Sequence, residues 1–233
     1  MIELTPELFL KAYACGVFPM AERHDSPEVY WIDPDFRGVL PLDDFHLPKR
    51  LARTMRSGLY RVTVDQDFAG TIRGCARRTQ KRRETWINAP LARVFTELHV
   101  RGHAHSVEVW RAGRLVGGLY GVALGAVFFG ESMFSLERDA SKVALVALIE
   151  RLKQGGFMLL DTQFVTAHLK RFGAIEIPRA TYLARLAEAL SRHASFYSGA
   201  SSTASAGAAL SPDTGSAPDE PASASKQSTT QMS

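Results

Sequence analysis

Cysteine is scarce in this chain, and long hydrophobic runs are missing from it. The 233 residues include two cysteines, Cys15 and Cys75, which lie far apart in the sequence. A disulfide framework or a zinc site is therefore not expected. No apolar run reaches the roughly 18 residues that a membrane span needs, and the acidic first residues lack the basic start of a signal peptide. We expect a cytoplasmic protein with reduced cysteines and no membrane association.

Several catalytic motifs are also missing. The seven histidines are scattered, and none stands in the HExxH pattern of zinc proteases. The sequence contains no G-x-S-x-G turn and no Walker loop. We therefore expect no metal ion, no cofactor and no covalent serine or cysteine intermediate.

Positive charge is concentrated in one part of the sequence. Residues 194–233 carry three acidic residues and one basic residue, so the net charge of +4 becomes +6 over residues 1–193. Residues 49–83 hold eleven basic and two acidic residues, a net charge of +9. Such a cluster indicates a polyanionic partner. The alternative is a solvated basic surface without a partner.

The sequence pattern predicts an α+β protein. Thr5 followed by Pro6 marks the start of a helix that ends near Gly16. A loop is expected through Pro19 and Pro34. Further helices are expected at residues 48–56, 68–78, 90–101, 141–154, 165–172 and 180–193. Strands are expected at residues 105–110, 115–123, 126–134, 157–164 and 176–177. From residue 194 the Ser- and Ala-rich sequence predicts a disordered tail.

Three positions stand out as candidate site residues. Glu131 interrupts an apolar strand, which costs free energy unless the carboxylate is paired or faces a cleft. Asp161 and Gln163 are two residues apart on another apolar strand, so their side chains are expected on one sheet face. Trp86 follows the basic cluster, as suits phosphate contact with base stacking. A salt-bridged structural Glu131 and a core Trp86 are the open alternatives.

Short motifs spread over residues 1–190 carry a resemblance to a known family. They are AYACGVFP (12–19), PDFR (34–37), YRVT (60–63), TWI (85–87), GHAHSVEVW (102–110), VGGLYG (116–121), GESMFS (130–135), ASK (140–142), LDTQ (160–163) and GAIEIPR (173–179). In this order and spacing the sequence resembles the leucyl/phenylalanyl-tRNA–protein transferases.

The resemblance implies an architecture and a reaction. It implies a small N-terminal domain with a tRNA-contacting helix at residues 1–62, and a catalytic domain like the GNAT acyltransferases at residues 63–193. The donor is a tRNA charged with Leu, Phe or Met, and the acceptor is a protein with N-terminal Arg or Lys. The modification marks that protein for degradation through the N-end rule. We expect a monomer.

The resemblance also implies roles for individual residues. Asp161, Gln163 and Glu131 would be catalytic. The side-chain pocket would be lined by Leu119, Phe128, Met133, Leu145 and Leu148. The tRNA would be contacted by Met20, Trp86, Lys49, Arg53 and Arg56. Met20 stands where the family often has Trp, and Leu148 where Phe is common, so adenosine stacking and the Leu/Phe preference are expected to differ here.

The residue types fit an aminoacyl transfer. An aminoacyl-tRNA is an activated ester, so an attacking amine needs alignment more than a covalent catalyst. We expect Asp161 to polarise Gln163, whose amide oxygen would hold the amine. One alternative is an acetyl-CoA-dependent N-acetyltransferase, which needs a glycine-rich pyrophosphate loop, and residues 136–141 contain no glycine. Another is a non-catalytic tRNA-binding module, which leaves Asp161 and Gln163 unexplained.

Overall fold

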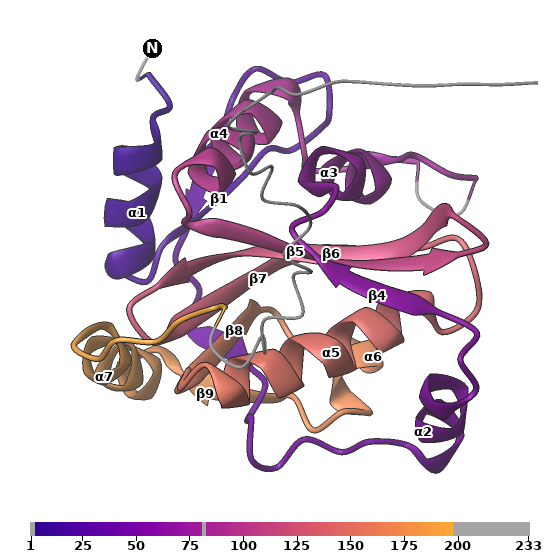
Figure 1. Ribbon diagram of the computed structural model, residues 1–233. Helices are drawn as coiled ribbons and strands as arrows, with labels where there is room; N and C mark the ends of the chain where they lie inside the picture. Colours follow the sequence, from indigo (N-terminus) through magenta and orange to yellow (C-terminus); the bar gives the residue numbers. More distant parts are fainter. Residues whose placement is uncertain (1–2, 81–82, 198–233) are drawn as a thin grey trace, which may run out of the picture. The chain divides into compact units, whose positions relative to one another are not determined.

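The computed structural model describes residues 3–80 and 83–197 (Figure 1). Its helices are α1 (Pro6–Ala14), α2 (Lys49–Arg56), α3 (Phe68–Ala76), α4 (Ala89–Val100), α5 (Ala140–Gln154), α6 (Ala167–Lys170) and α7 (Arg179–Leu190). Its strands are β1 (Phe18–Met20), β2 (Tyr30–Ile32), β3 (Phe36–Val39), β4 (Arg61–Val64), β5 (Ala104–Arg111), β6 (Arg114–Leu124), β7 (Val127–Ser135), β8 (Leu159–Gln163) and β9 (Ile175–Pro178). This combination of helices and strands confirms the expected α+β fold.

A seven-stranded sheet in the order β4-β5-β6-β7-β8-β3-β9 forms the centre of the fold. Strands β5, β6 and β7 make the antiparallel meander that the sequence predicts. Strands β7 and β8 are parallel, and α5 connects them. A separate two-stranded sheet pairs β1 with β2.

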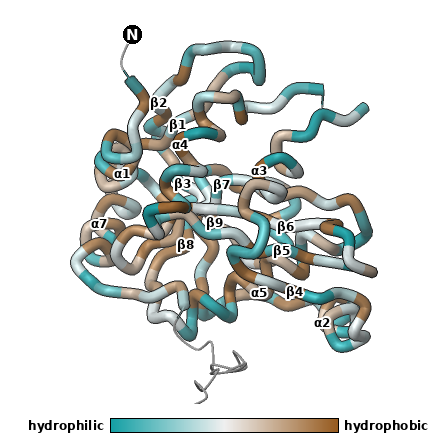
Figure 2. Tube along the Cα trace, turned by 45° about the horizontal axis from the view of Figure 1, so that its top comes forward, coloured by the Kyte–Doolittle hydropathy of each residue, from teal (hydrophilic) through white to brown (hydrophobic). Residues whose placement is uncertain are grey.

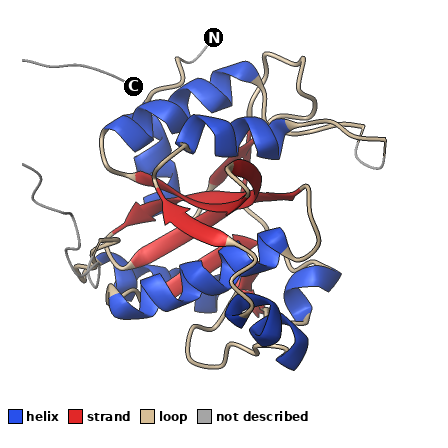
Figure 3. Ribbon diagram, turned by 45° about the vertical axis from the view of Figure 1, so that its right-hand side comes forward, coloured by secondary structure: helices blue, strands red, loops and turns tan. Residues whose placement is uncertain are grey.

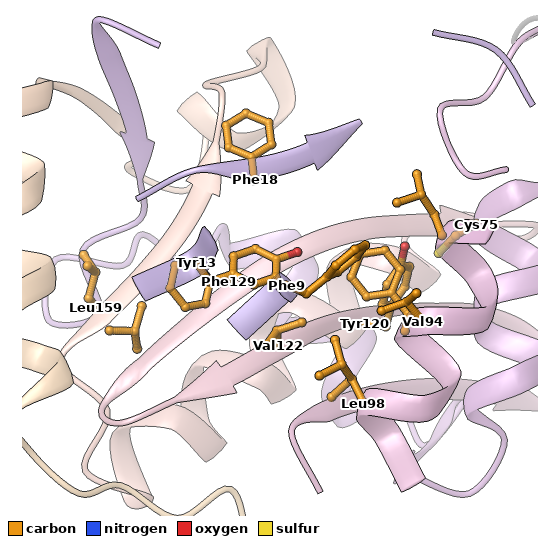
Figure 4. Close-up of a cluster of buried hydrophobic side chains, with 14 of the residues drawn as sticks. Phe9, Tyr13, Phe18, Cys75, Val94, Leu98, Tyr120, Val122, Phe129 and Leu159 are labelled. Carbon is orange, nitrogen blue, oxygen red and sulfur yellow. The ribbon is translucent and has the colours of Figure 1, made fainter. Parts of the chain in front are cut away.

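Helices cover both faces of the large sheet (Figure 3). Side chains of α1, α3 and α4 share one hydrophobic cluster with β6 and β7, and side chains of α5 form the second cluster with β5, β6 and β8. Figure 4 shows the first cluster, in which Phe9 and Tyr13 of α1 meet Phe129 of β7 and Tyr120 of β6. The tube in Figure 2 shows hydrophilic residues on α2.

The helix starts follow local capping signals. The Thr5 hydroxyl accepts a hydrogen bond from the Leu8 N–H at 3.3 Å, and the Asn88 side chain accepts one from the Leu91 N–H at 2.9 Å. These contacts satisfy backbone donors that a helix leaves free in its first turn. The helices expected to begin after Thr5 and at residue 90 are confirmed as α1 and α4. These side-chain caps explain where the two helices begin. The expected helix at residues 165–172 is shorter, and α6 covers Ala167–Lys170.

The region expected to be a loop between α1 and α2 contains three strands. Strands β1 and β2 pair from Phe18↔Ile32 to Met20↔Tyr30. Strand β3 lies between β8 and β9, pairing with both in antiparallel register. Strands of three or four residues have no periodicity of their own, so the sequence pattern did not reveal them. The large sheet therefore combines strands from both sides of residue 62. A domain boundary at this residue stays a prediction.

The last described residues belong to the fold. Phe196 is 4% exposed, and its ring stacks on Phe128 with a centroid distance of 5.4 Å. The Ser195 N–H donates to the Gly155 carbonyl at 3.0 Å, and an Arg151 N–H donates to the Phe196 carbonyl at 2.8 Å. The expected start of the tail at residue 194 is therefore wrong for residues 194–197. Residues 198–233 of the expected tail lie outside the described residues.

Helices long and apolar enough to cross a membrane are not found among the residues that the structure describes. Over the same residues, no group of three or more His, Cys, Asp and Glu side chains is arranged to hold a metal ion.

Candidate functional site

A cavity of about 360 Å³ lies where two parallel strands separate. Pairing between β7 and β8 runs from Val127↔Leu159 to Phe129↔Asp161. The next residues of both strands line the cavity, namely residues 130–133 of β7 and 162–163 of β8. The remaining walls come from β1 (residues 18–20), β6 (119–120), α5 (145 and 148), Leu160, Trp86 and the segment after β8 (164, 166, 168 and 169). Most of these side chains are apolar.

A buried ion pair fixes the strand end beside this cavity. The Nη2 atom of Arg37 lies 2.7 Å from Oδ2 of Asp161, and its Nε donates to the same carboxylate at 2.9 and 3.1 Å. The Tyr182 hydroxyl donates to Oδ2 at 2.7 Å. Arg37 is 1% exposed and Asp161 is 0% exposed. Buried charges of this kind persist only when they are paired and hydrogen-bonded.

Arg37 is held on all sides. Its Nη1 donates to the Gly16 carbonyl at 2.9 Å, and its guanidinium carbon lies 4.4 Å from the Phe18 ring centroid and 4.7 Å from that of Tyr182. Arg37 stands in the PDFR motif, but it is not among the site residues that the sequence analysis predicts. The sequence feature that could have indicated this role is Asp161, an acidic residue in an apolar strand. When such a residue is buried, it needs a cation from another part of the chain.

The contact between Asp161 and Gln163 differs from the expected one. The backbone N–H of Gln163 donates to Oδ1 of Asp161 at 2.8 Å, and the Asp161 carboxylate does not line the cavity. Gln163 has a φ of +56°, a left-handed conformation that is rare for a side chain of this type. Such backbone costs about 1–2 kcal/mol, so the Asp161 carboxylate stabilises the turn rather than contacting the Gln163 amide.

The Gln163 side chain meets Glu131 at the cavity wall. Its Nε2 atom donates to Oε1 of Glu131 at 3.3 Å. The Tyr13 hydroxyl of α1 donates to the same oxygen at 2.7 Å. Burial raises the pKa of Glu131 to about 8, while the hydrogen bond from Tyr13 opposes that rise. The two hydrogen-bonding partners are neutral, so Glu131 is predominantly protonated at pH 7.

Tyr13 is a contributor that sequence reasoning missed. It lies in the AYACGVFP motif, on the buried side of α1, and its ring packs against Phe129 with a centroid distance of 4.7 Å. Tyr13 and Glu131 are 118 positions apart in the sequence, so no local pattern indicates that they are in contact.

The expected pocket residues divide into two groups. Leu119, Met133, Leu145 and Leu148 line the cavity. Phe128 does not, because its ring is fully buried and stacks on Phe196 in the hydrophobic core. The expectation that Phe128 lines the pocket is therefore not supported by its position.

The residues expected to contact the tRNA also lie in two separate places. Met20 and Trp86 line the cavity together with Phe18. Lys49, Arg53 and Arg56 are exposed on α2, whose Leu51 is buried in the cluster on the α5 face. The three basic side chains share the helix face that their spacing predicts, but they do not line the cavity.

Comparisons with known proteins agree over most of the chain. Residues 39–187 match the family described as leucyl/phenylalanyl-tRNA protein transferase, and residues 2–35 match the N-terminal domain of that family. A protein named leucyl/phenylalanyl-tRNA–protein transferase from Nitrobacter winogradskyi is 59% identical over 194 residues, which cover 83% of this chain and 86% of the relative. A protein of the same name from Rhodopseudomonas palustris is 57% identical, with the same coverage.

Similarity to solved structures is weak. The structure of L-PGS from Bacillus licheniformis matches with a TM-score of 0.41 and 9% identity, covering 68% of each chain. The C-terminal domain of a putative lysylphosphatidylglycerol synthetase from Agrobacterium fabrum has a TM-score of 0.38 and 13% identity, covering 79% of this chain and 62% of the other. These values are too low to assign a fold.

Proposed function

Because this chain belongs to the leucyl/phenylalanyl-tRNA protein transferase family, we propose that it transfers Leu or Phe from aminoacyl-tRNA to the α-amino group of proteins with N-terminal Arg or Lys. Met would be transferred less well, and the product would be a degradation signal of the N-end rule. The observation that carries this proposal is the apolar cavity with Gln163 and Glu131 together on its wall.

The cavity suits an apolar side chain of the donor. Leu119, Met133, Leu145 and Leu148 offer apolar contacts, and burying a Leu, Phe or Met side chain is worth about 1.5–3 kcal/mol. An apolar pocket separates such near-isosteres by small factors only. A preference for Leu and Phe with some acceptance of Met is the expected result.

The reaction requires one proton to move. The neutral acceptor amine attacks the ester carbonyl carbon, a C–N bond forms, and the C–O bond to the tRNA ribose breaks. The amine loses a proton and the ribose oxygen gains one. An α-amino group has a pKa near 8, and the pKa of Glu131 is about 8. The first value means that part of the acceptor amine is neutral at pH 7 and can attack. We assign to Glu131, which holds its proton at pH 7, donation of that proton to the leaving ribose oxygen and uptake of the proton that the nitrogen loses once the C–N bond has formed.

Gln163 and the ion pair behind it have a positioning role in this proposal. Donation from Nε2 of Gln163 to Glu131 leaves the amide oxygen to accept a hydrogen bond from the incoming amine. Asp161 and Arg37 hold the backbone of Gln163 from the side away from the cavity. Alignment of this kind supplies several kcal/mol in reactions that need no covalent intermediate.

Two surfaces would hold the tRNA. Trp86 and Met20 would contact the terminal adenosine beside the cavity, because both line it. Lys49, Arg53 and Arg56 would contact the phosphate backbone from α2, where all three are exposed. A GNAT-like fold, a cytoplasmic location and a monomeric state remain predictions.

A labelled-transfer assay tests the proposal. tRNA charged with radioactive Leu is incubated with the chain and a protein that begins with Arg, and with a matched protein that begins with Ala. We expect label on the Arg protein only. Absence of label on the Arg protein, with intact Leu-tRNA in the assay, contradicts the proposed reaction.

A pair of variants separates the role of the Gln163 side chain from that of its backbone. Gln163→Ala removes the amide and keeps the backbone strain of the wild type, whereas Gln163→Gly removes the amide and also tolerates the left-handed φ of +56° without strain. We expect both variants to lose transfer under single-turnover conditions, and Gln163→Gly to retain the wild-type unfolding temperature. Near-normal transfer by Gln163→Gly would rule out a role for the side chain.

A further inference from the structure

A second cavity, of about 480 Å³, lies between α2 and the segment that leads from β7 into α5. Figure 1 shows α2 beside the point where the chain enters β4. The cavity is lined by Arg50, Thr54, Leu59, Tyr60, Arg111, Glu137, Arg138 and Asp139. None of these residues lines the cavity that holds Glu131, and the reaction proposed above does not use them.

A buried carboxylate in the wall of this cavity is surrounded by three cations. The Asp139 side chain is 5% exposed, and its Oδ1 atom lies 2.5 Å from Nζ of Lys142. Its Oδ2 atom lies 3.1 Å from Nη2 of Arg50 and 3.8 Å from Nε of Arg138. Three positive charges against one negative charge leave an excess of +2 at this wall.

The other acidic side chain at the cavity does not reduce that excess. Oε2 of Glu137 accepts a hydrogen bond from Nη1 of Arg111 at 2.7 Å, so these two charges balance each other. Burial would raise the pKa of Asp139, but the hydrogen bonds from Lys142 and Arg50 bring it below its ordinary value. Asp139 is therefore ionised at pH 7, and the excess of +2 holds there.

The cavity continues the basic surface of α2. Lys49, Arg53 and Arg56 share one face of this helix, where all three are exposed. An α-helix turns by about 100° per residue, so Arg50 and Thr54 lie on the adjacent face, and both line the cavity. A nucleic-acid backbone that follows the exposed face of α2 can therefore place a phosphate in the cavity.

The two arginines that face each other across the cavity are accessible to a ligand. The Arg50 side chain is 61% exposed and that of Arg138 is 74% exposed. A guanidinium group offers several N–H donors in a planar arrangement that matches phosphate oxygens. Arg50 belongs to α2 and Arg138 to the segment before α5, so a phosphate between them would be held from two sides.

We propose that this cavity binds a phosphate group of the tRNA backbone, held between Arg50 and Arg138. The inference rests on the proposed aminoacyl transfer and adds to it a phosphate contact from outside α2. A phosphodiester carries one negative charge, which the excess of +2 attracts. The contact involves no base, so it would hold tRNAs of different sequence alike.

The test measures how the affinity for uncharged leucine tRNA depends on salt. The cavity variant carries Arg50→Gln and Arg138→Gln. Its matched control carries Arg185→Gln and Arg192→Gln, which also remove two exposed arginines, on and after α7 at the other end of the large sheet (Figure 1). The cavity variant should lower the slope of log affinity against log salt by about one, which corresponds to roughly tenfold weaker binding at about 0.1 M salt. The control should keep the wild-type slope.

A variant of the carboxylate separates phosphate binding from a purely structural role. If the cluster only anchored α2 to α5, Asp139→Asn would weaken tRNA binding as the cavity variant does, because it removes the same ion pairs. If the cations hold a phosphate, Asp139→Asn should leave the affinity unchanged or raise it, because it adds one positive charge to the cavity. Asn, like Asp, adopts the left-handed φ of +65° found at this position.

The contradicting results are distinct for the two proposals. Failure of Leu transfer in the wild type contradicts the proposed function. Normal Leu transfer, with the same slope for the cavity variant and its control, overturns only the phosphate site. Weaker tRNA binding by a folded Asp139→Asn variant also overturns it, and the comparison of slopes does not depend on that variant.

Discussion

Replacing Arg37 by Met removes one partner of the most buried ion pair at the site. Arg37 and Asp161 are 1% and 0% exposed, and the guanidinium makes three contacts of 2.7–3.1 Å with the carboxylate. The variant leaves the Asp161 carboxylate with the Tyr182 hydroxyl and the Gln163 N–H as hydrogen-bonding partners, but without a cation. Removing one partner of a buried pair costs about 3–5 kcal/mol. That is a large part of the roughly 5–15 kcal/mol by which domains are stable.

Arg179 provides a matched control on the surface. Its Nε lies 2.6 Å from Oδ1 of Asp33, but the two side chains are 43% and 40% exposed. Water and salt screen such a pair, which is worth about 0–1 kcal/mol. The free energy of unfolding is measured by urea titration for the wild type, Arg37→Met and Arg179→Met. Arg37→Met is expected to lower it several-fold more than Arg179→Met does.

A double variant identifies the cause of that loss. Arg37→Met together with Asp161→Asn removes both charges and keeps an oxygen that accepts from the Gln163 N–H. We expect the double variant to be more stable than Arg37→Met alone, because no uncompensated charge stays buried. Equal losses for Arg37→Met and Arg179→Met, or no recovery in the double variant, would refute the reasoning from charge burial.

Three further outcomes are expected. In the folded state the pKa of Glu131 is about 8, against an ordinary value of 4.5. The free energy of unfolding should therefore fall as pH rises between these two values. Urea titrations across that range should show a smaller fall for Glu131→Gln. Phe196→Ala should lose about 3–5 kcal/mol in the same assay, since it empties a buried ring site; a loss below 1 kcal/mol would show that the residue is dispensable. Neutralising Lys49 and Arg53 with Gln should reduce the slope of log affinity for tRNA against log salt by about one per lost phosphate contact, and an unchanged slope would remove α2 from the tRNA surface.

Features with a local cause could be predicted from the sequence. Thr5 with Pro6, and Asn88 before the next helix, satisfy the first-turn N–H groups of their own helices. The meander of β5–β7 follows from apolar segments separated by short turns, one of which holds Gly125 at a φ of +57°. In each case the residues that decide the structure stand within a few positions of the element that they form.

Features that depend on distant contacts could not be predicted. Strand β3 exists because it pairs with β8 and β9, more than 120 residues along the chain. Arg37 meets Asp161 across 124 residues, and Tyr13 meets Glu131 across 118. The same holds for Phe196, whose ring stacks on Phe128 and whose carbonyl accepts from Arg151, 45 residues earlier in the chain. A prediction from composition gives little weight to a single aromatic residue. It therefore places the start of the tail at residue 194, although residues 194–197 belong to the fold.

The two carboxyl groups at the site have different hydrogen-bonding and charged partners. Asp161 is paired with a guanidinium and accepts hydrogen bonds from Tyr182 and from the Gln163 backbone, so its lone pairs are occupied away from the cavity. Glu131 has neutral partners and lines the cavity itself. Pairs of carboxyl groups in contrasting surroundings commonly divide charge and proton transfer between them.

The geometry of β8 gives the ion pair a direct connection to the cavity. Gly38 of β3 approaches the turn so closely that an added Cβ would lie 2.7 Å from the Phe164 carbonyl carbon. Arg37 on the same strand holds Asp161, and Asp161 holds the left-handed backbone of Gln163. Pairing between β7 and β8 ends at Phe129↔Asp161, just before that turn, and residues of both strands beyond this point line the cavity. The buried pair thus holds the strand end beside the cavity, and Glu131 is the carboxyl group that we propose to meet the substrate.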